Sequence, residues 1–396
     1  MITLMKNTPT LAALFSCVLG SLSAQPPPAA GGSPVNREAA ALAEPFVGIT
    51  TDGKAQSGLF HLRSTGVTTE PVKKAAGAFL AGLTPEQRAK TLFPVDDSEW
   101  RKWMNVHRYV RQGVSFLEMS EAQRAAAFGL LRASLSAKGL KLSQDIMKLN
   151  HTLGELNNNT FTEYGEWLYH ITVMGEPSAT KPWGWQIDGH HLIINYFVLG
   201  DQVVMSPVFV GSEPVIARAG KYQGIAILQE EQSRGLAMVR SLDEGQRKQA
   251  ILDANKPGNN NYAEGFKDNA VVPRTGLLGA NLNAAQRKEL LGLVELFVDN
   301  MDGGHAQVKM AEVRAHLEQT SFAWVGGTAD DSVYYYRIHS PVVLIEFDHQ
   351  RPANTRHLQK NPQQPIRDHI HVVVRTPNGN DYGKDLLRQH LLAHPH

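Results

Sequence analysis

Two histidines separated by one residue, His369 and His371, lie at the start of an apolar stretch, residues 370–374, that is typical of a β-strand. Alternate residues of a strand point to the same face, so we expect both imidazoles on one side, with Cα atoms roughly 6.5–7 Å apart. From that spacing both rings can reach one divalent metal ion. The same pattern also occurs in pairs of surface or hydrogen-bonded histidines, and the spacing alone leaves both interpretations open.

Other polar residues in apolar segments are candidates to complete such a site. His190 and His191 begin a strongly β-forming stretch, residues 190–199. Neighbouring strand residues face opposite ways, so only one of the two is expected to join. Glu346 lies within the apolar stretch 342–347, where a carboxylate is costly unless it is paired or bound to a cation. The arginines that could pair with it instead are Arg337, Arg367 and Arg375.

Histidines with one carboxylate form a common set of ligands for zinc, iron, manganese or copper, with an open position for water or substrate. Trp183 and Trp185 flank a glycine just before the paired histidines. They predict either a buried aromatic corner that packs on the sheet, or an aromatic wall suited to a sugar ring, an aromatic ring or a peptide. The sequence has no G-x-S-x-G, H-E-x-x-H, P-loop or Rossmann motif.

Several strands and capped helices are predicted to position these residues. The predicted strands are residues 166–173, 190–199, 202–207, 332–338, 342–347 and 370–374. Four helices are predicted to begin with a capping box, in which a polar residue precedes a glutamine by three positions. Their N-caps are Thr84, Ser120, Asp243 and Asn283. The spacing between the caps is not constant, which argues against a solenoid.

The order of these elements predicts the fold class. Helices flank the strands in blocks rather than alternating with them, which favours an α+β fold with a largely antiparallel sheet flanked by capped amphipathic helices. An Asn-rich stretch, residues 255–269, is expected to be a long loop. The helix and strand pattern resumes beyond it without a change of composition, so residues 39–396 are expected to form a single globular domain.

Composition and charge exclude several classes of protein. The chain has 396 residues, with 42% hydrophobic and 19% charged residues, which is globular composition. Its 39 Lys and Arg balance 38 Asp and Glu, so there is no excess positive charge to attract nucleic acid. The only cysteine, Cys17, lies near the N-terminus. Beyond that segment the chain therefore has no disulfide, no catalytic thiolate and no cysteine-ligated metal.

The N-terminal segment is predicted to be a signal peptide, residues 1–24. Lys6 precedes an apolar stretch over residues 11–22, and small residues follow it. A Pro/Gly/Ala-rich tether, residues 25–38, comes next. No later hydrophobic stretch is long enough to span a bilayer. The mature protein is therefore expected to be secreted or periplasmic, without membrane contact after cleavage; the sequence leaves its oligomeric state open.

A larger set of residues, spread over the chain, carries a resemblance to a known family. The set includes Tyr164, Gly175-Glu176-Pro177, Pro182-Trp183-Gly184-Trp185, Gly189-His190-His191-Leu192, Asn195, Phe322-Ala323-Trp324, Gly326, Tyr335-Tyr336-Arg337-Ile338, Ile345-Glu346, His369-Ile370-His371, Arg375, Asp381-Tyr382-Gly383, Leu386-Leu387 and His390. In this order the sequence resembles the bacterial and fungal domain-of-unknown-function family 3500, from about residue 39 to residue 390. The resemblance implies one structural unit and carries no activity.

Together these features predict a secreted metal-dependent enzyme, with a hydrolase favoured and a redox metalloenzyme as a close variant. The cofactor would be one divalent transition metal, zinc, iron, copper or manganese. The expected ligands are His190 or His191, Glu346, His369 and His371. Asp381 or Tyr382 would supply an acid, a base or an orienting group, and Arg375 an oxyanion or carboxylate contact. Trp183, Trp185 and Tyr164 would contact a small-molecule or polymeric substrate. The alternative is a non-catalytic secreted or periplasmic protein that binds a ligand in an aromatic groove.

Overall fold

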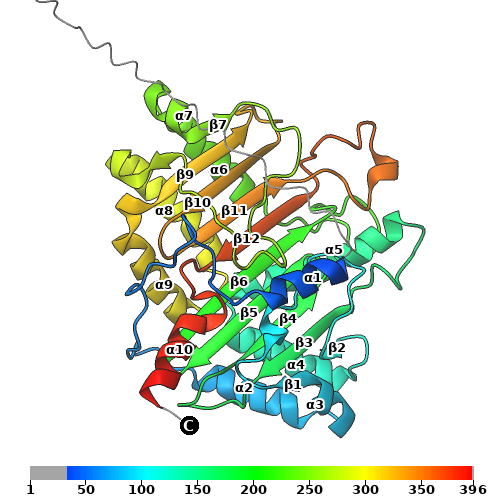
Figure 1. Ribbon diagram of the computed structural model, residues 1–396. Helices are drawn as coiled ribbons and strands as arrows, with labels where there is room; N and C mark the ends of the chain where they lie inside the picture. The colour runs from blue at the N-terminus through cyan, green and yellow to red at the C-terminus, as the bar shows by residue number, and fades with distance from the viewer. Residues whose placement is uncertain (1–33, 395–396) are drawn as a thin grey trace, which may run out of the picture.

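A computed structural model describes residues 34–394 of the chain (Figure 1). The predicted signal peptide and the first part of the predicted tether lie outside the described residues. The helix α1 (Pro34–Ala43) covers the end of that tether. None of the described helices is long and apolar enough to cross a membrane.

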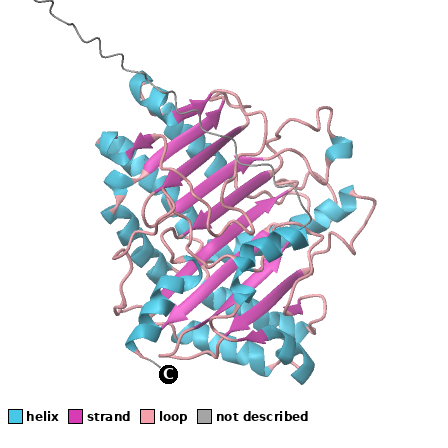
Figure 2. Ribbon diagram, in the orientation of Figure 1, coloured by secondary structure: helices cyan, strands magenta, loops and turns pink. Residues whose placement is uncertain are grey.

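The strands form a single, mostly antiparallel 12-stranded sheet, which confirms the predicted α+β class (Figure 2). The strands are β1 (Leu92–Phe93), β2 (Val114–Ser115), β3 (Tyr169–Met174), β4 (Trp183–Gly189), β5 (Leu192–Leu199), β6 (Gln202–Ser212), β7 (Ile251–Asp253), β8 (Leu277–Leu278), β9 (Ser321–Gly326), β10 (Tyr334–His339), β11 (Leu344–His349) and β12 (Ile370–Arg375). Their order across the sheet is β1-β3-β4-β5-β6-β12-β11-β10-β9-β7, with β2 paired to β3 and β8 paired to β9. The sheet therefore has β6 and β12 at its centre.

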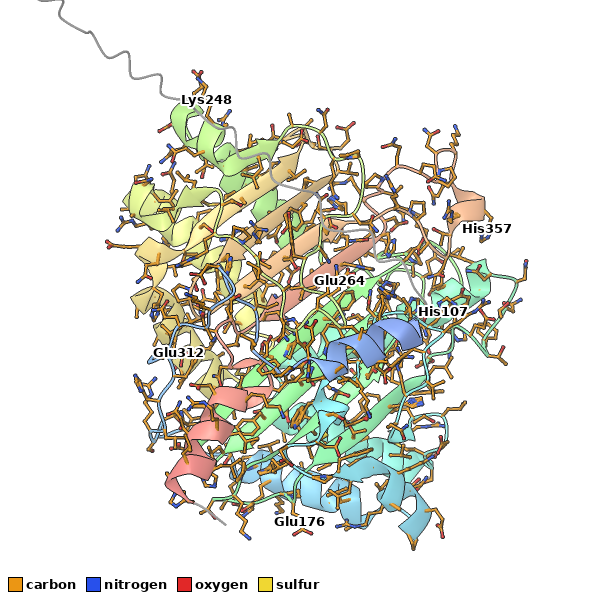
Figure 3. All side chains as sticks on the ribbon, viewed as in Figure 1. His107, Glu176, Lys248, Glu264, Glu312 and His357 are labelled. Atoms are coloured by element: carbon orange, nitrogen blue, oxygen red, sulfur yellow. The ribbon has the colours of Figure 1, made fainter. Side chains whose placement is uncertain are left out.

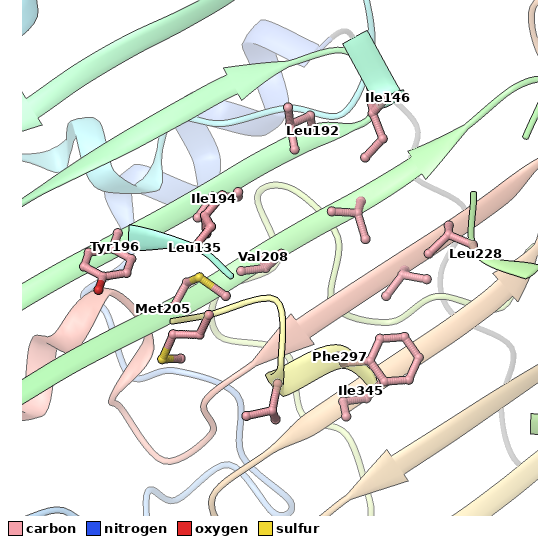
Figure 4. Packing of buried hydrophobic residues seen from close by; sticks show 14 of the residues in the cluster. Leu135, Ile146, Leu192, Ile194, Tyr196, Met205, Val208, Leu228, Phe297 and Ile345 are labelled. Atoms are coloured by element: carbon pink, nitrogen blue, oxygen red, sulfur yellow. The ribbon is translucent and has the colours of Figure 1, made fainter. Parts of the chain in front are cut away.

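Helices cover one face of this sheet. The remaining helices are α2 (Glu70–Ala81), α3 (Pro85–Thr91), α4 (Glu121–Ser134), α5 (Ala137–Leu156), α6 (Gln229–Arg240), α7 (Glu244–Ala250), α8 (Ala284–Val298), α9 (Gly303–Ala315) and α10 (Lys384–Ala393). The larger core packs α2, α4, α5, α6, α8 and α9 against strand residues that point to their side. Figure 4 shows part of this layer, with Leu192, Ile194, Met205 and Val208 from the strands and Phe297 from α8 in one cluster.

Long loops, together with α1 and α10, cover the other face (Figure 1). Because successive strand residues alternate, Val372 joins the helix-side core while its neighbour Val373 joins the second core. That second core includes Trp103 from one loop and Ala263 from the predicted long loop, which runs without helix or strand between β7 and β8. The loop-covered face is where the polar residues of interest lie.

The two halves of the chain repeat one order of elements. Each half has a helix pair, a short strand that pairs in parallel, a short antiparallel strand, a second helix pair and four antiparallel strands. Trp185 stacks on Tyr196 across β4 and β5, and Tyr336 stacks on Phe347 across β10 and β11 in the same way. The halves meet where β6 pairs with β12. The fold is therefore an internal duplication with a pseudo-two-fold relation at the centre of the sheet.

The four predicted capping boxes are all confirmed, at the starts of α3, α4, α7 and α8. They occupy matching places in the two halves, which explains why their spacing along the chain is not constant. The strand predictions were incomplete, because β4, β9 and the short strands β1, β2, β7 and β8 were not among them. The β4 segment contains the Trp-Gly-Trp sequence, whose glycine and closely spaced tryptophans do not look like an alternating strand.

Candidate metal centre

Three histidines meet on the loop-covered side of the central strands. His369 and His371 stand at the start of β12, and His191 lies in the two-residue turn between β4 and β5. The sheet order places β6 between β5 and β12, with Gly211 of β6 directly opposite His371. The amide of Gly211 donates to the carbonyl of His191. A Cβ on Gly211 would lie 2.4 Å from the carbonyl oxygen of Ile370 and 3.3 Å from Cδ2 of His191, so this close approach requires glycine.

The three imidazoles direct their Nε2 atoms to one point. The Nε2 atom of His371 lies 3.0 Å from that of His369 and 3.1 Å from that of His191. The Nε2 atoms of His369 and His191 are 3.4 Å apart. A tetrahedral zinc ion with nitrogen ligands at about 2.0–2.1 Å separates neighbouring nitrogens by about 3.3–3.4 Å. The three residues form the group whose ligand atoms could hold a metal ion.

The second ring nitrogens fix which protons the histidines carry. His369 Nδ1 lies 2.7 Å from the carbonyl oxygen of Arg351, which can only accept, so this nitrogen donates. His371 Nδ1 lies 2.7 Å from Oε1 of Glu264. Burial raises the pKa of Glu264, and in its ionised form this carboxylate likewise only accepts. In neutral rings both Nε2 atoms therefore carry a lone pair and no proton. These two lone pairs face each other at 3.0 Å, which is repulsive unless a cation lies between them.

Burial favours the neutral rings that metal binding needs. Removal from water lowers the pKa of His191 and of His371 well below the ordinary value, and the neighbouring imidazoles lower it further. Burial would raise the pKa of Glu213, but His369 and hydrogen bonds from the 353–355 segment hold it below its usual value. Glu213 Oε2 is 3.7 Å from His369 Nδ1. Carboxylates that orient histidine ligands in this way are a regular feature of metal sites.

The sequence left open which member of the His190-His191 pair joins the site, and the structure brings His191 into it. The prediction that both begin a strand was wrong, because β5 starts at Leu192. His191 has a left-handed backbone, with φ of 62°. The ring of His190 stacks on that of His191 with centroids 4.1 Å apart, and its Nδ1 lies 2.8 Å from Oδ1 of Asn150. His190 therefore supports His191 rather than offering a nitrogen to the group.

Glu346 lies outside this group. Its carboxylate accepts hydrogen bonds from the backbone amides of Tyr262 and Ala263 and from the hydroxyl of Tyr335, at 2.7–3.1 Å. In the register of β10 and β11 it stands opposite Arg337. The expectation that a buried carboxylate needs partners was sound, but the loop supplies them in place of a metal.

Arg375, Asp381 and Tyr382 form a fully buried network beside the site. Arg375 Nη1 lies 2.8 Å from Asp268 Oδ1 and 3.1 Å from Asp381 Oδ2. The hydroxyl of Tyr382 donates to the same Asp268 oxygen at 2.8 Å. Arg375 also donates to the carbonyl oxygen of Glu264 at 3.2 Å. The network therefore anchors the loop that carries Glu264, and it places no free acid, base or anion-binding group next to the three Nε2 atoms.

The predicted substrate-binding aromatic residues have different surroundings. Trp183 and Trp185 are both 0% exposed and belong to the helix-side core, so they present no surface to a ligand. Tyr164 does lie near the site. Its hydroxyl is 3.3 Å from Nε2 of His107, and its ring centroid is 6.1 Å from that of His190. Of the three aromatic residues, only Tyr164 borders the histidine group.

Glu264, Glu213 and Arg351 were not identified from the sequence, although each contacts a histidine of the group. Figure 3 shows Glu264 over the middle of the sheet, with His107 nearby. Glu264 and Arg351 both lie in long loops, where no hydrophobic periodicity indicates which way a side chain points. Glu213 directly follows β6, and its position at a strand end was the one available signal.

Comparison with known proteins gives a family and no activity. No curated protein and no solved structure matches the chain. A family model does match, over residues 65–384, and its description is "Protein of unknown function (DUF3500)". The match covers most of the chain and includes all three histidines, as the resemblance in the motifs implied. The chain therefore belongs to the DUF3500 family.

Proposed function

We propose that the chain is a metal-dependent enzyme in which His191, His369 and His371 hold one divalent transition-metal ion. The observation that carries this proposal is the approach of the Nε2 atoms of His369 and His371 to 3.0 Å in a buried site, while the Nδ1 atoms face the carbonyl of Arg351 and the carboxylate of Glu264. Buried acceptors without a donor are costly, and a cation between them removes that cost. Imidazole ligands suit zinc, copper and iron.

Hydrolysis is the favoured reaction, and redox chemistry with copper or iron is the close variant. Three protein nitrogens leave a position for water, and a bound zinc ion would lower the pKa of that water to about 7. Glu264 and the carbonyl of Arg351 keep protons on the Nδ1 atoms of His371 and His369, so the Nε2 atoms stay available. The side chain of Glu264 is 24% exposed, which makes this side of the site the one that a substrate can approach.

The alternative, a non-catalytic protein with an aromatic groove, has less support. Trp183 and Trp185 would have to line that groove, and both are buried in the helix-side core.

We retain export as part of the proposal, on the sequence of residues 1–24 alone. N-terminal sequencing of protein recovered from periplasm or medium should find a terminus near Gln25, and an intact Met1 on cytosolic protein would contradict export.

Metal analysis of the full chain, purified without a histidine tag, tests the proposed centre. We expect about one zinc, copper or iron ion per chain in the wild type, and less than a tenth of that in His369→Ala and His371→Ala. For the third ligand, His191→Asn is the suitable change, because asparagine tolerates the left-handed backbone at this position. His357→Ala is the matched control, since His357 is exposed in a short 3-10 helix, Arg356–Leu358, away from the site (Figure 3).

Two results would contradict the proposal. One is a wild-type chain that binds no transition metal after dialysis against each ion and elution from a desalting column. The other is a metal content that His357→Ala reduces as much as His371→Ala does. If the metal is present, hydrolysis of a panel of ester, amide and phosphoester substrates should be lost on chelation and restored by the same ion. Chelation without effect on any measured turnover would favour the non-catalytic alternative.

A further inference from the structure

A cavity lies at the opposite end of the central strand pair from the three histidines. Its volume is about 290 Å³, and it is enclosed by the start of β6, by α8 and α9, and by residues 59–65. Most of its wall is apolar and comes from the helix-side core, with Met205, Val208, Phe297 and Val374 among the lining residues. Figure 4 shows Met205, Val208 and Phe297 around this part of the core. An apolar cavity with a few polar groups is the usual form of a small-molecule site.

Two of the polar groups that line the cavity have no partner among the described residues. Arg63 is exposed, and no hydrogen bond or ion pair engages its guanidinium. Asn300 is buried, and its Oδ1 lacks a hydrogen-bond partner. Of the other basic side chains that line the cavity, His316, Lys309 and His305 are already engaged, and His61 is exposed. Lys309 contacts Glu312 at 3.2 Å and the carbonyl of Val342 at 2.8 Å, and His305 contacts Asp302 at 2.6 Å.

The size and charge of the cavity indicate what it can hold. A volume of 290 Å³ is at the lower end of the roughly 300–1,000 Å³ range of small-molecule sites, which suits a ligand with on the order of ten non-hydrogen atoms. An apolar body of that size fits the wall. A free guanidinium at the rim matches a carboxylate in a two-point hydrogen bond. The amide of Asn300 can donate to the ligand or accept from it.

We propose that this cavity binds a small amphipathic carboxylate, with a body of about ten carbons in the apolar part and its carboxylate on Arg63. The proposal does not depend on the metal centre, because none of the three histidines lines the cavity. Glu312 also lines the cavity, but its contact with Lys309 leaves the charge of Arg63 as the unmatched one.

Calorimetric titration of the full chain with decanoate tests this site. We expect one decanoate per chain and about fourfold weaker binding for each methylene removed, in a series through octanoate to hexanoate. Arg63→Gln should weaken decanoate binding at least tenfold, because a charge-assisted hydrogen bond is lost. It should leave the weaker binding of decanol unchanged. Val203→Trp, which places a large side chain in the cavity, should remove the binding of both ligands.

Matched controls separate this site from the proposed metal centre. Arg388→Gln changes another exposed arginine and should bind decanoate as the wild type does. Metal content should be the same in all these variants, so failure here is distinct from failure of the proposed function. No binding of decanoate to the wild type at 1 mM would overturn the proposal, as would equal affinity in Arg63→Gln and the wild type. Arg63 is exposed, so its replacement is not expected to unfold the chain.

Discussion

The two ends of the central strand pair, β6 and β12, have the same arrangement of strands but carry different side chains. At the start of β12, His369 and His371 point to the loop-covered face, and at the start of β6, its counterpart in the first half, the apolar Val204 points to that face. The turn between β4 and β5 carries His191, whereas the matching turn between β10 and β11 carries Val342. The duplicated strands therefore set out two equivalent places, and only one of them has ligands for a metal.

The loops account for most of the difference. Between β5 and β6 there are only Gly200 and Asp201, while the matching connection between β11 and β12 runs over residues 350–369 and brings Arg351 to His369. The loop between β7 and β8 adds Glu264. In many functional sites a rigid scaffold fixes the positions and loops supply the reactive side chains.

The largest expected effect tests how the metal-side loop is anchored. Arg375 in β12 occupies the position that Phe209 occupies in β6. Arg375 pairs with Leu344 of β11, and Phe209 pairs with Ile193 at the equivalent position of β5. Replacement of Arg375 by methionine would leave Asp381 buried without its cation and would leave Asp268 with Arg101 as its one remaining cationic partner among the described residues. We expect a loss of about 3–5 kcal/mol in the free energy of unfolding, measured by urea denaturation.

The control for this change is Arg388→Met, which removes an exposed arginine paired with Asp385. It should alter the free energy of unfolding by less than about 1 kcal/mol. If Arg375→Met were as mild as Arg388→Met, the buried network would not be the anchor of the loop that carries Glu264.

A smaller effect is expected from one carboxylate change made at each end of the strand pair. Glu264→Ala removes the group that orients His371, and Glu312→Ala removes a carboxylate that lines the apolar cavity (Figure 3). Loss of such an orienting partner typically weakens metal binding by about 10–100-fold. We expect that loss for Glu264→Ala in competition with a chelating dye, and no change for Glu312→Ala. Equal affinities in the two variants would remove Glu264 from the metal site.

The sequence predicted the parts of this site that depend on strand periodicity. His369 and His371 were paired because residues two apart in a strand share a face, and the structure has their Nε2 atoms 3.0 Å apart. The helix starts were also predictable, because a capping box is a local interaction between residues three positions apart. Local rules of this kind need no knowledge of the tertiary structure.

The surroundings of the other candidate residues could be known only from the tertiary structure. Glu346 looked like a metal ligand because its partners, the amides of Tyr262 and Ala263, lie far away in the chain. Backbone amides carry no sequence signal, so a buried carboxylate that they bind cannot be told from one that binds a cation. Trp185 was equally ambiguous, since its position between Gly184 and a polar residue concealed the strand that buries it.

The smallest expected effect tests whether the two halves are energetically equivalent. Gln123 and Gln286 hold matching positions in the capping boxes of α4 and α8. Each accepts from the backbone amide of its N-cap, and each donates to a second glutamine and to a carbonyl oxygen of the neighbouring helix end. Gln123→Ala and Gln286→Ala should therefore each lower the free energy of unfolding by about 1 kcal/mol.

The two losses should agree to within about 0.5 kcal/mol in urea denaturation, and they should add in the double variant because the two glutamines share no hydrogen-bond partner. Gln56→Ala, at an exposed position in a loop, serves as the control and should have little effect. A large loss of unfolding free energy for one variant and none for the other would mean that the matching hydrogen bonds of the two halves do not contribute equally to stability. The two halves of the chain would then differ in the stability of their helix starts as well as in their loops.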